Sequence, residues 1–127
     1  MPKQPADALP RLLLAEDEAD LRSTMALVLQ AAGYDVVAVA GTEEALAQLQ
    51  AGRFDVVVSD VTMPGGGGRA VYAAALELPE PPPVVLVSGH VDDAEAARLL
   101  PGCSALLKPF GLTQLVEAVL DARGCAG

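Results

Sequence analysis

Five short apolar runs, each followed by a segment with helical spacing, constrain the fold more than any other feature of the chain. The runs are rich in Val and Leu and are bounded by a charged residue, Gly or Pro, which is typical of buried strands. Because their apolar character hardly alternates, we expect strands that are covered on both faces. The runs are RLLLA (11–15), DVVAV (35–39), FDVVVS (54–59), PVVLVS (83–88) and SALL (104–107).

The segments after these runs predict helices. Apolar residues recur at helical spacing in the first segment, and Gly33 marks its end. Thr42 precedes the second helix like a capping residue, and Asp92 or Asp93 does the same for the fourth. The expected helices cover residues 19–32, 42–50, 69–78, 93–101 and 112–122. Strands alternating with helices predict an α/β fold in which right-handed crossovers join a parallel sheet.

Length and composition limit the function. A chain of 127 residues fits one domain. The net charge of −9 argues against nucleic acid and anionic membranes as partners, but not against a basic protein. No apolar run reaches the length of a membrane span, and the N-terminal segment lacks the apolar core of a signal peptide. We therefore expect a cytoplasmic protein in which Cys103 and Cys125 are reduced.

Polar side chains follow four of the five expected strands. Glu16 and Asp17 come after the first strand, Asp60 after the third, Ser88 after the fourth and Lys108 after the fifth. The carboxyl ends of parallel strands meet at one edge of a sheet, where ligands bind in open α/β folds. Each residue alone fits an ordinary role as a cap, turn residue or surface charge. Together they predict a site.

The acidic part of this site predicts a metal ion. Carboxylates that meet at one edge repel each other unless a cation lies between them. A set of oxygen ligands without His or Cys suits Mg²⁺, with Mn²⁺ as the alternative. We expect Asp17 and Asp60 to bind the ion directly and Glu16 to hold one of its waters. The backbone carbonyl of Thr62 completes the set.

The metal, a hydroxyl and an ammonium together predict phosphoryl chemistry. Ser88 and Lys108 are suited to bind oxygens of a phosphoryl group, and Asp60 is then the nucleophile that accepts it. The site is interpreted as one for phosphoryl transfer to a carboxylate.

The segments LLLAEDE, VVVSDVTMPGGGG, VVLVSGH and ALLKPF, in this order, resemble the receiver domain of two-component response regulators, the CheY-like family. The resemblance covers residues 10–123, leaves 1–9 and 124–127 as loose ends, and includes no effector domain. It implies a single flavodoxin-like (βα)5 doubly wound sheet with strand order 2-1-3-4-5. It also implies a regulatory domain rather than an enzyme, one that catalyses only its own phosphorylation and dephosphorylation.

The family's roles transfer to individual residues of this chain. Glu16 and Asp17 match the acidic pair that binds the metal, and Asp60 matches the phosphoacceptor. Ser88 matches the hydroxyl that turns toward the phosphoryl group. Lys108 matches the conserved lysine, whose bond to the following Pro109 is often cis in this family. The implied donor is a sensor histidine kinase or a histidine phosphotransfer protein, and the implied assembly is a monomer or weak homodimer.

The sequence departs from the family in its acidic pair, at Ala105 and in a glycine run. The pair Glu16–Asp17 stands where many members have two aspartates, which is a common variant. Ala105 stands where the family has its switch aromatic, so the usual coupling of a hydroxyl to a ring cannot operate in that form. The glycines at 65–68 indicate either tolerance in a surface loop, which we favour, or a mobile lid over Asp60. His90 lies where the family tunes the access of water, and we expect a solvated loop residue rather than a catalytic base.

Other site types fit the sequence less well. Residues 65–70 fit G-x-G-x-x-A, but this dinucleotide fingerprint belongs after a first strand, not a third. A D-x-D phosphatase needs an acid where Thr62 stands, and no P-loop motif is present. The open choice lies within the receiver reading: a free-standing regulator, or a receiver resembling those of hybrid histidine kinases that work in a phosphorelay. A non-phosphorylated pseudo-receiver that acts as an interaction module is the alternative, and the complete acidic set argues against it.

Overall fold

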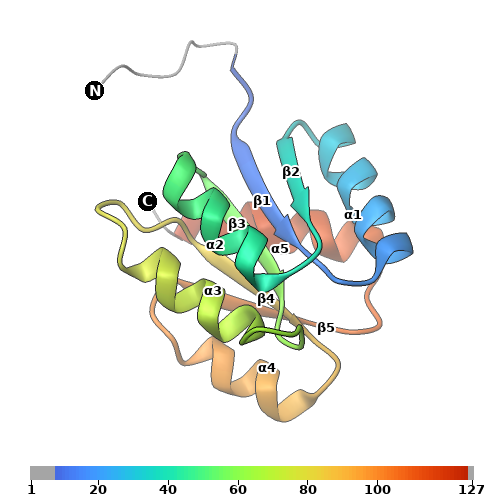
Figure 1. The fold of residues 1–127 in the computed structure, drawn as a ribbon. Helices are drawn as coiled ribbons and strands as arrows, with labels where there is room; N and C mark the ends of the chain where they lie inside the picture. Colours follow the sequence, from blue (N-terminus) through green and yellow to red (C-terminus); the bar gives the residue numbers. More distant parts are fainter. Residues whose placement is uncertain (1–7, 126–127) are drawn as a thin grey trace.

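A parallel sheet with helices on both of its faces forms the protein (Figure 1). The computed structural model describes residues 8–125. The sheet has five strands in the order β2-β1-β3-β4-β5, which confirms the flavodoxin-like doubly wound α/β fold and its predicted strand order. The strands are β1 (Arg11–Ala15), β2 (Asp35–Val39), β3 (Val56–Asp60), β4 (Val84–Ser88) and β5 (Cys103–Leu107).

Each strand is followed by a helix, as predicted, although several helix ends differ. The helices are α1 (Ala19–Ala31), α2 (Thr42–Ala51), α3 (Gly67–Leu76), α4 (Val91–Arg98) and α5 (Leu112–Cys125). The α4 helix ends earlier than predicted, because the residue before Pro101 is disfavoured in helical conformation. The α5 helix continues past the predicted end at residue 122, into the segment expected to be loose. Residues 1–7, also expected to be loose, lie outside the described residues, and no helix within 8–125 is long and apolar enough to span a membrane.

The predicted helix caps are wrong. Gly41 occupies the N-cap position of α2 and His90 that of α4, and no side chain caps either of these two helices. Asp92 and Asp93 lie inside the first turn of α4, where their charge still favours the positive end of the helix dipole. Thr42 is likewise the first helical residue of α2 rather than its cap, and its hydroxyl is bound elsewhere.

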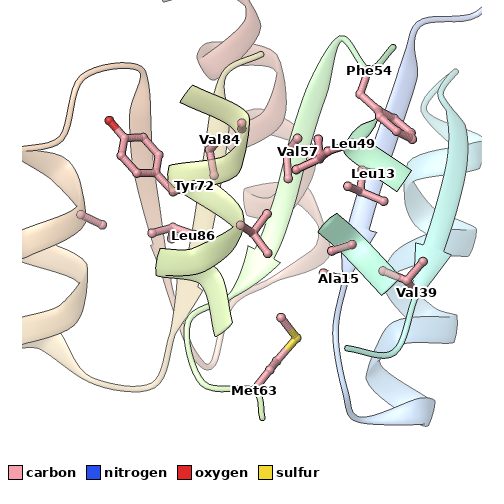
Figure 2. Close-up of a cluster of buried hydrophobic side chains, with 14 residues drawn as sticks. Leu13, Ala15, Val39, Leu49, Phe54, Val57, Met63, Tyr72, Val84 and Leu86 are labelled. Atoms are coloured by element: carbon pink, nitrogen blue, oxygen red, sulfur yellow. The ribbon is translucent and has the colours of Figure 1, made fainter. Parts of the chain in front are cut away.

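The hydrophobic core consists of two clusters, one on each face of the sheet. Helices α2, α3 and α4 cover one face, shown in Figure 2, where the buried side chains of Leu13, Val57 and Leu86 meet those of the helices. Helices α1 and α5 cover the other face, onto which Leu12 and Val58 point. Successive residues of the strands thus alternate between two apolar layers, which explains the continuous apolar runs in the sequence.

Burial on both faces holds only for the three central strands. Every residue of β3 and β4 is buried, as are four of the five in β1. The edge strands β2 and β5 are mostly half-buried, with only Val39 fully buried. The prediction that the strands are covered on both faces was therefore wrong for the two edge strands. Their inner contacts are apolar, whereas their outer side meets solvent.

Two segments from opposite ends of the described chain contact the start of β2, at the amino-terminal edge of the sheet. The N–H of Asp35, at the start of β2, donates to the carbonyl of Pro10 over 2.9 Å. From α5, Nη1 of Arg123 donates to the hydroxyl of Tyr34 over 3.3 Å, and its guanidinium carbon lies 5.4 Å from the centre of that ring. The segment entering β1 and the last turns of α5 are thus both fixed beside the start of β2.

The glycine run before α3 is required by geometry, so the favoured prediction of mere tolerance was wrong. The backbone φ angles at 65, 66 and 67 are 92°, 109° and 61°, a region that side chains rarely allow. A Cβ on Gly67 would collide with the carbonyl oxygen of Val61, and one on Gly68 would lie 2.7 Å from Cδ2 of Leu86 and 2.9 Å from the carbonyl oxygen of Asp60. The backbone of α3 therefore approaches β3 as closely as it does only because these positions lack side chains.

Candidate functional site

The carboxyl edge of the sheet collects the polar residues that the sequence pointed to. Glu16 and Asp17 directly follow β1, Asp60 is the last residue of β3, Ser88 is the last of β4, and Lys108 directly follows β5. Because β1, β3, β4 and β5 are neighbours in this order, four chain segments converge at one place.

Three carboxylates form the centre of the site. One carboxylate oxygen from each of Glu16, Asp17 and Asp60 lies within 4.8 Å of the other two. Glu16 is 1% exposed and Asp60 is 6% exposed, whereas Asp17 faces solvent. The cluster is thus buried on its inner side and open on its outer side, which suits an ion that enters from solvent and keeps several waters.

The ammonium of Lys108 is the positive charge of the site. Its Nζ lies 3.1 Å from Oδ2 of Asp60 and 3.6 Å from Oε1 of Glu16. Burial lowers the pKa of Lys108, but its hydrogen bond and attraction to Asp60, together with Glu16, outweigh burial and leave that pKa raised. The lysine backbone is fixed as well, since its N–H donates to the carbonyl of Ser88 over 2.7 Å and its bond to Pro109 is cis, as the family resemblance implied.

Glu16 is the least satisfied polar group of the site. Its Oε2 accepts the backbone N–H of Glu18 over 3.1 Å, whereas its buried Oε1 has no hydrogen-bond partner. Burial raises the pKa of Glu16, as does the nearby charge of Asp60, against the opposing effects of the Glu18 N–H and of Lys108. A buried carboxylate oxygen without a donor is costly. Hard oxygen donors with one unsatisfied member fit a divalent cation such as Mg²⁺.

The second oxygen of Asp60 points to the following loop. Oδ1 accepts the N–H of Thr62 over 3.2 Å, while Oδ2 contacts Lys108. The side chain is thus held from both sides. The backbone of Thr62 thus lies beside the carboxylate of Asp60.

Ser88 lies at the predicted edge, and its hydroxyl is bound to the backbone of His90. It donates to the carbonyl of His90 over 3.0 Å and accepts the N–H of the same residue over 2.9 Å. This local turn places His90 at the start of α4 with its side chain exposed, as expected for a loop histidine. The structure therefore brings Glu16, Asp17, Asp60 and Lys108 together, and leaves the Ser88 hydroxyl in a separate local arrangement.

Two residues near the site were not assigned to it from the sequence, where Thr42 was expected only to cap its own helix. Nη1 of Arg22, in α1, donates to the backbone carbonyl of Glu16 over 2.9 Å and so ties the start of α1 to the acidic pair. Thr42 binds the loop after β3. An arginine at helical spacing and a threonine at a helix start are common on surfaces, so neither gave a signal in the sequence.

Ala105 borders open space rather than a packed ring. It is half-buried in β5 and contributes to a hollow of about 390 Å³ between this strand and α5, which is lined mainly by small residues. On its other side Ala105 packs against the core cluster that contains Tyr72.

The sequence matches the family model described as the response regulator receiver domain over residues 12–120. The chain belongs to this family. As a receiver domain of two-component signalling, it is a regulatory domain and not an enzyme of the ordinary kind. Its fold and the order of its acidic and basic segments agree with this membership.

Similar proteins include whole regulators and kinases. The chain is 36% identical over 118 residues to the C4-dicarboxylate transport transcriptional regulatory protein DctD of Rhizobium meliloti (strain 1021), covering 91% of the chain and 26% of that protein. It is 37% identical over 115 residues to the sensor kinase CckA of Brucella abortus (strain 2308), covering 87% of the chain and 12% of that protein. The chain thus spans about a quarter or less of these two relatives.

A solved structure agrees over nearly the whole chain. The crystal structure of a response regulator receiver protein from Sinorhizobium medicae WSM419 superposes with a TM-score of 0.85 at 32% identity, covering 94% of this chain and 98% of that one. The agreement extends the family assignment from sequence to architecture.

Proposed function

We propose that the receiver accepts a phosphoryl group on Asp60 from a phosphohistidine, in a reaction that depends on Mg²⁺. One observation carries the proposal: the carboxylate of Asp60 sits between the ammonium of Lys108 at 3.1 Å and the acidic pair Glu16 and Asp17. A nucleophile between a fixed cation and a cation-binding cluster is the arrangement that phosphoryl transfer requires.

Glu16, Asp17, Asp60 and the carbonyl of Thr62 would hold the metal. When bound, Mg²⁺ would neutralise the carboxylates and stabilise negative charge on the phosphoryl oxygens. The choice is supported by the all-oxygen donor set and by Oε1 of Glu16, which is buried without a hydrogen bond. Mn²⁺ has the same preference for oxygen and is the expected substitute.

Asp60 and Lys108 would carry out the remaining steps of the reaction. A carboxylate oxygen of Asp60 attacks phosphorus, a new P–O bond forms, and the P–N bond of the donor breaks with its electron pair remaining on the imidazole nitrogen. Lys108, already paired with Asp60, stays beside the acceptor and balances the charge of the group that arrives. Asp17 is the exposed member of the carboxylate cluster, and the donor imidazole would approach from its side.

Ser88 has a role only after it turns. Its hydroxyl now bonds to the backbone of His90. A rotation about one side-chain bond would redirect it toward a phosphoryl group on Asp60, at the cost of the bonds to His90. The start of α4 would then lose a contact, which links occupancy of Asp60 to the loop between β4 and α4.

The donor is proposed to be a sensor histidine kinase or a histidine phosphotransfer protein. Similarity to part of the sensor kinase CckA supports a place in a phosphorelay, and similarity to DctD supports a place in a transcriptional regulator. Both settings use the same chemistry at Asp60.

The test is intact-mass spectrometry after incubation with acetyl phosphate, with and without Mg²⁺. We expect one phosphoryl adduct that requires the metal and disappears in Asp60→Asn. The control Asp121→Asn changes an exposed carboxylate on α5 and should label like the wild type. Equal labelling of the Asp60 variant would reject the acceptor. No labelling by acetyl phosphate or by a phosphorylated histidine phosphotransfer protein would leave an interaction module as the function.

A further inference from the structure

Thr42 makes two hydrogen bonds to a distant loop. It is the first residue of α2 and is only 1% exposed. Its hydroxyl donates to the carbonyl of Pro64 over 2.8 Å and accepts the N–H of Gly67 over 3.0 Å. One side chain of α2 thus satisfies both a carbonyl of the loop after β3 and an amide of α3.

The start of α3 needs this partner. The first amides of a helix have no partner inside the helix and are usually satisfied by a capping side chain. Here the N-cap position is Gly66, which has no side chain to offer. The N–H of Gly68 finds the carbonyl of Val61 over 3.2 Å, and the N–H of Gly67 finds the hydroxyl of Thr42. Thr42 therefore caps α3 from another helix.

The loop that Thr42 holds is the one that carries the Thr62 carbonyl. At the near end, the N–H of Val61 donates to the carbonyl of Val87 over 2.9 Å, and Oδ1 of Asp60 accepts the N–H of Thr62. At the far end, the carbonyl of Pro64 is fixed by Thr42. The side chain of Met63 between them is buried against the core, as Figure 2 shows.

The loop after β3 packs tightly against the side chain of Thr42. A Cβ on Gly65 would lie 3.2 Å from Cβ of Thr42, so the loop backbone passes directly over this side chain. A substitution at residue 42 therefore affects the loop backbone directly, because no other side chain lies between them.

We propose that Thr42 is a positioning residue for the metal site: its hydroxyl fixes the loop so that the Thr62 carbonyl is presented beside Asp60. Thr42 touches neither the metal ligands nor the acceptor. It acts through the backbone of residues 62–67. The inference rests on the proposed Mg²⁺ and phosphoryl chemistry and adds to it a residue of α2.

The test compares variants of Thr42 that differ in the hydroxyl or methyl group of the side chain. Thr42→Val keeps the shape and removes the hydroxyl, Thr42→Ser keeps the hydroxyl, and Thr42→Ala removes it without adding a methyl beside the loop. Thr113→Val, at an exposed position in α5, is the control for the threonine-to-valine change itself. The alanine variant carries the test alone if the valine variant does not fold.

Three quantities are measured. In the metal-free protein, the N–H of residue 67 should exchange with solvent faster in Thr42→Val and at the wild-type rate in Thr42→Ser. By calorimetry, the Mg²⁺ dissociation constant should rise about tenfold without the hydroxyl, the loss typical of groups that orient ligands, and should be restored in the serine variant. At saturating Mg²⁺, the rate of labelling by acetyl phosphate should return close to the wild-type rate, because the acceptor and Lys108 are unchanged.

Unchanged Mg²⁺ affinity in folded Thr42→Val or Thr42→Ala, with normal binding by the wild type, would overturn this inference alone. Loss of affinity that Thr42→Ser does not restore would also overturn it, since the effect would then come from packing and not from the hydroxyl. Failure of the wild type to bind Mg²⁺ or to label would instead overturn the proposed function, and this inference with it.

Discussion

Nζ of Lys108 lies 3.1 Å from Oδ2 of Asp60, although 48 residues separate the two in the chain. The same ammonium lies 3.6 Å from Oε1 of Glu16. One flexible side chain from the edge strand thus balances two buried carboxylates from the two strands at the centre of the sheet. In the absence of a metal ion, this contact is the main counterweight to their repulsion.

We expect Lys108→Met to destabilise the metal-free protein. Removing the cation leaves two buried carboxylates without an opposite charge, which costs several kcal/mol in a fully buried pair. Because the lysine side chain is 28% exposed, solvent screening reduces this to about 2 kcal/mol. Urea unfolding at neutral pH, with and without Mg²⁺, measures the effect.

The metal should compensate for the missing ammonium. Mg²⁺ should therefore raise the free energy of unfolding more in Lys108→Met than in the wild type. An equal increase in both proteins would show that the ammonium and the metal site do not share the same carboxylates.

Glu16→Gln should have opposite effects on stability and metal binding. Burial raises the pKa of Glu16 above its ordinary value of 4.5, so the folded state binds the proton more tightly than the unfolded state. The carboxylate then costs stability at neutral pH, and this cost disappears as the pH falls through the raised pKa to 4.5. The neutral amide should make the metal-free protein more stable at pH 7 and weaken its binding of Mg²⁺.

The pH dependence distinguishes this cause from packing. Thermal unfolding of both proteins should show an advantage for Glu16→Gln at pH 7 that shrinks as the pH approaches 4.5. An advantage independent of pH would assign the effect to the shape of the amide instead of the charge.

Gly68→Ala should destabilise the fold strongly. The new Cβ would lie 2.7 Å from Cδ2 of Leu86 and 2.9 Å from the carbonyl oxygen of Asp60, and a backbone atom cannot move aside as a side chain can. We expect a loss of about 3 kcal/mol, at the upper end for overpacking in a core. Gly89→Ala is the matched control, since a Cβ there meets nothing within 4 Å. Similar losses in both variants would mean that the close approach of α3 to β3 is not the cause.

Cys103 should react slowly with alkylating reagents. Burial raises the pKa of its thiol from 9.0 to about 11, so the thiolate at pH 8 is about 100-fold scarcer than in the unfolded chain. In a Cys125→Ser background, mass spectrometry should show iodoacetamide labelling that is slower by about this factor in buffer than in urea. Comparable rates in the two conditions would mean that the thiol is neither buried nor shifted.

The order of strands and helices and the acidic and basic ends of the site were accessible from the sequence because they follow from local patterns. Apolar runs mark strands, and polar residues at the ends of four of these runs predict a site in combination. Asp60, Glu16 and Lys108 were found in this way, and their proximity followed from the parallel sheet alone.

Contacts between distant segments were not accessible. The hydrogen bond between Thr42 and Gly67 depends on how α2 and α3 pack. From the sequence alone, a threonine at a helix start could equally well cap its own helix. The rotamer of Ser88 was missed for a related reason, since its hydroxyl has two competing partners and only the backbone of the loop decides between them. The need for glycine at 67 and 68 likewise arises from the close approach of α3 to β3.

The anchoring of Pro10 and Arg123 beside the start of β2 places both ends of the described chain at the pole opposite Asp60. A domain joined to the receiver at either of these ends would leave uncovered the edge at which we propose phosphoryl transfer. The same arrangement would suit a receiver attached to a kinase or to a transcriptional regulator.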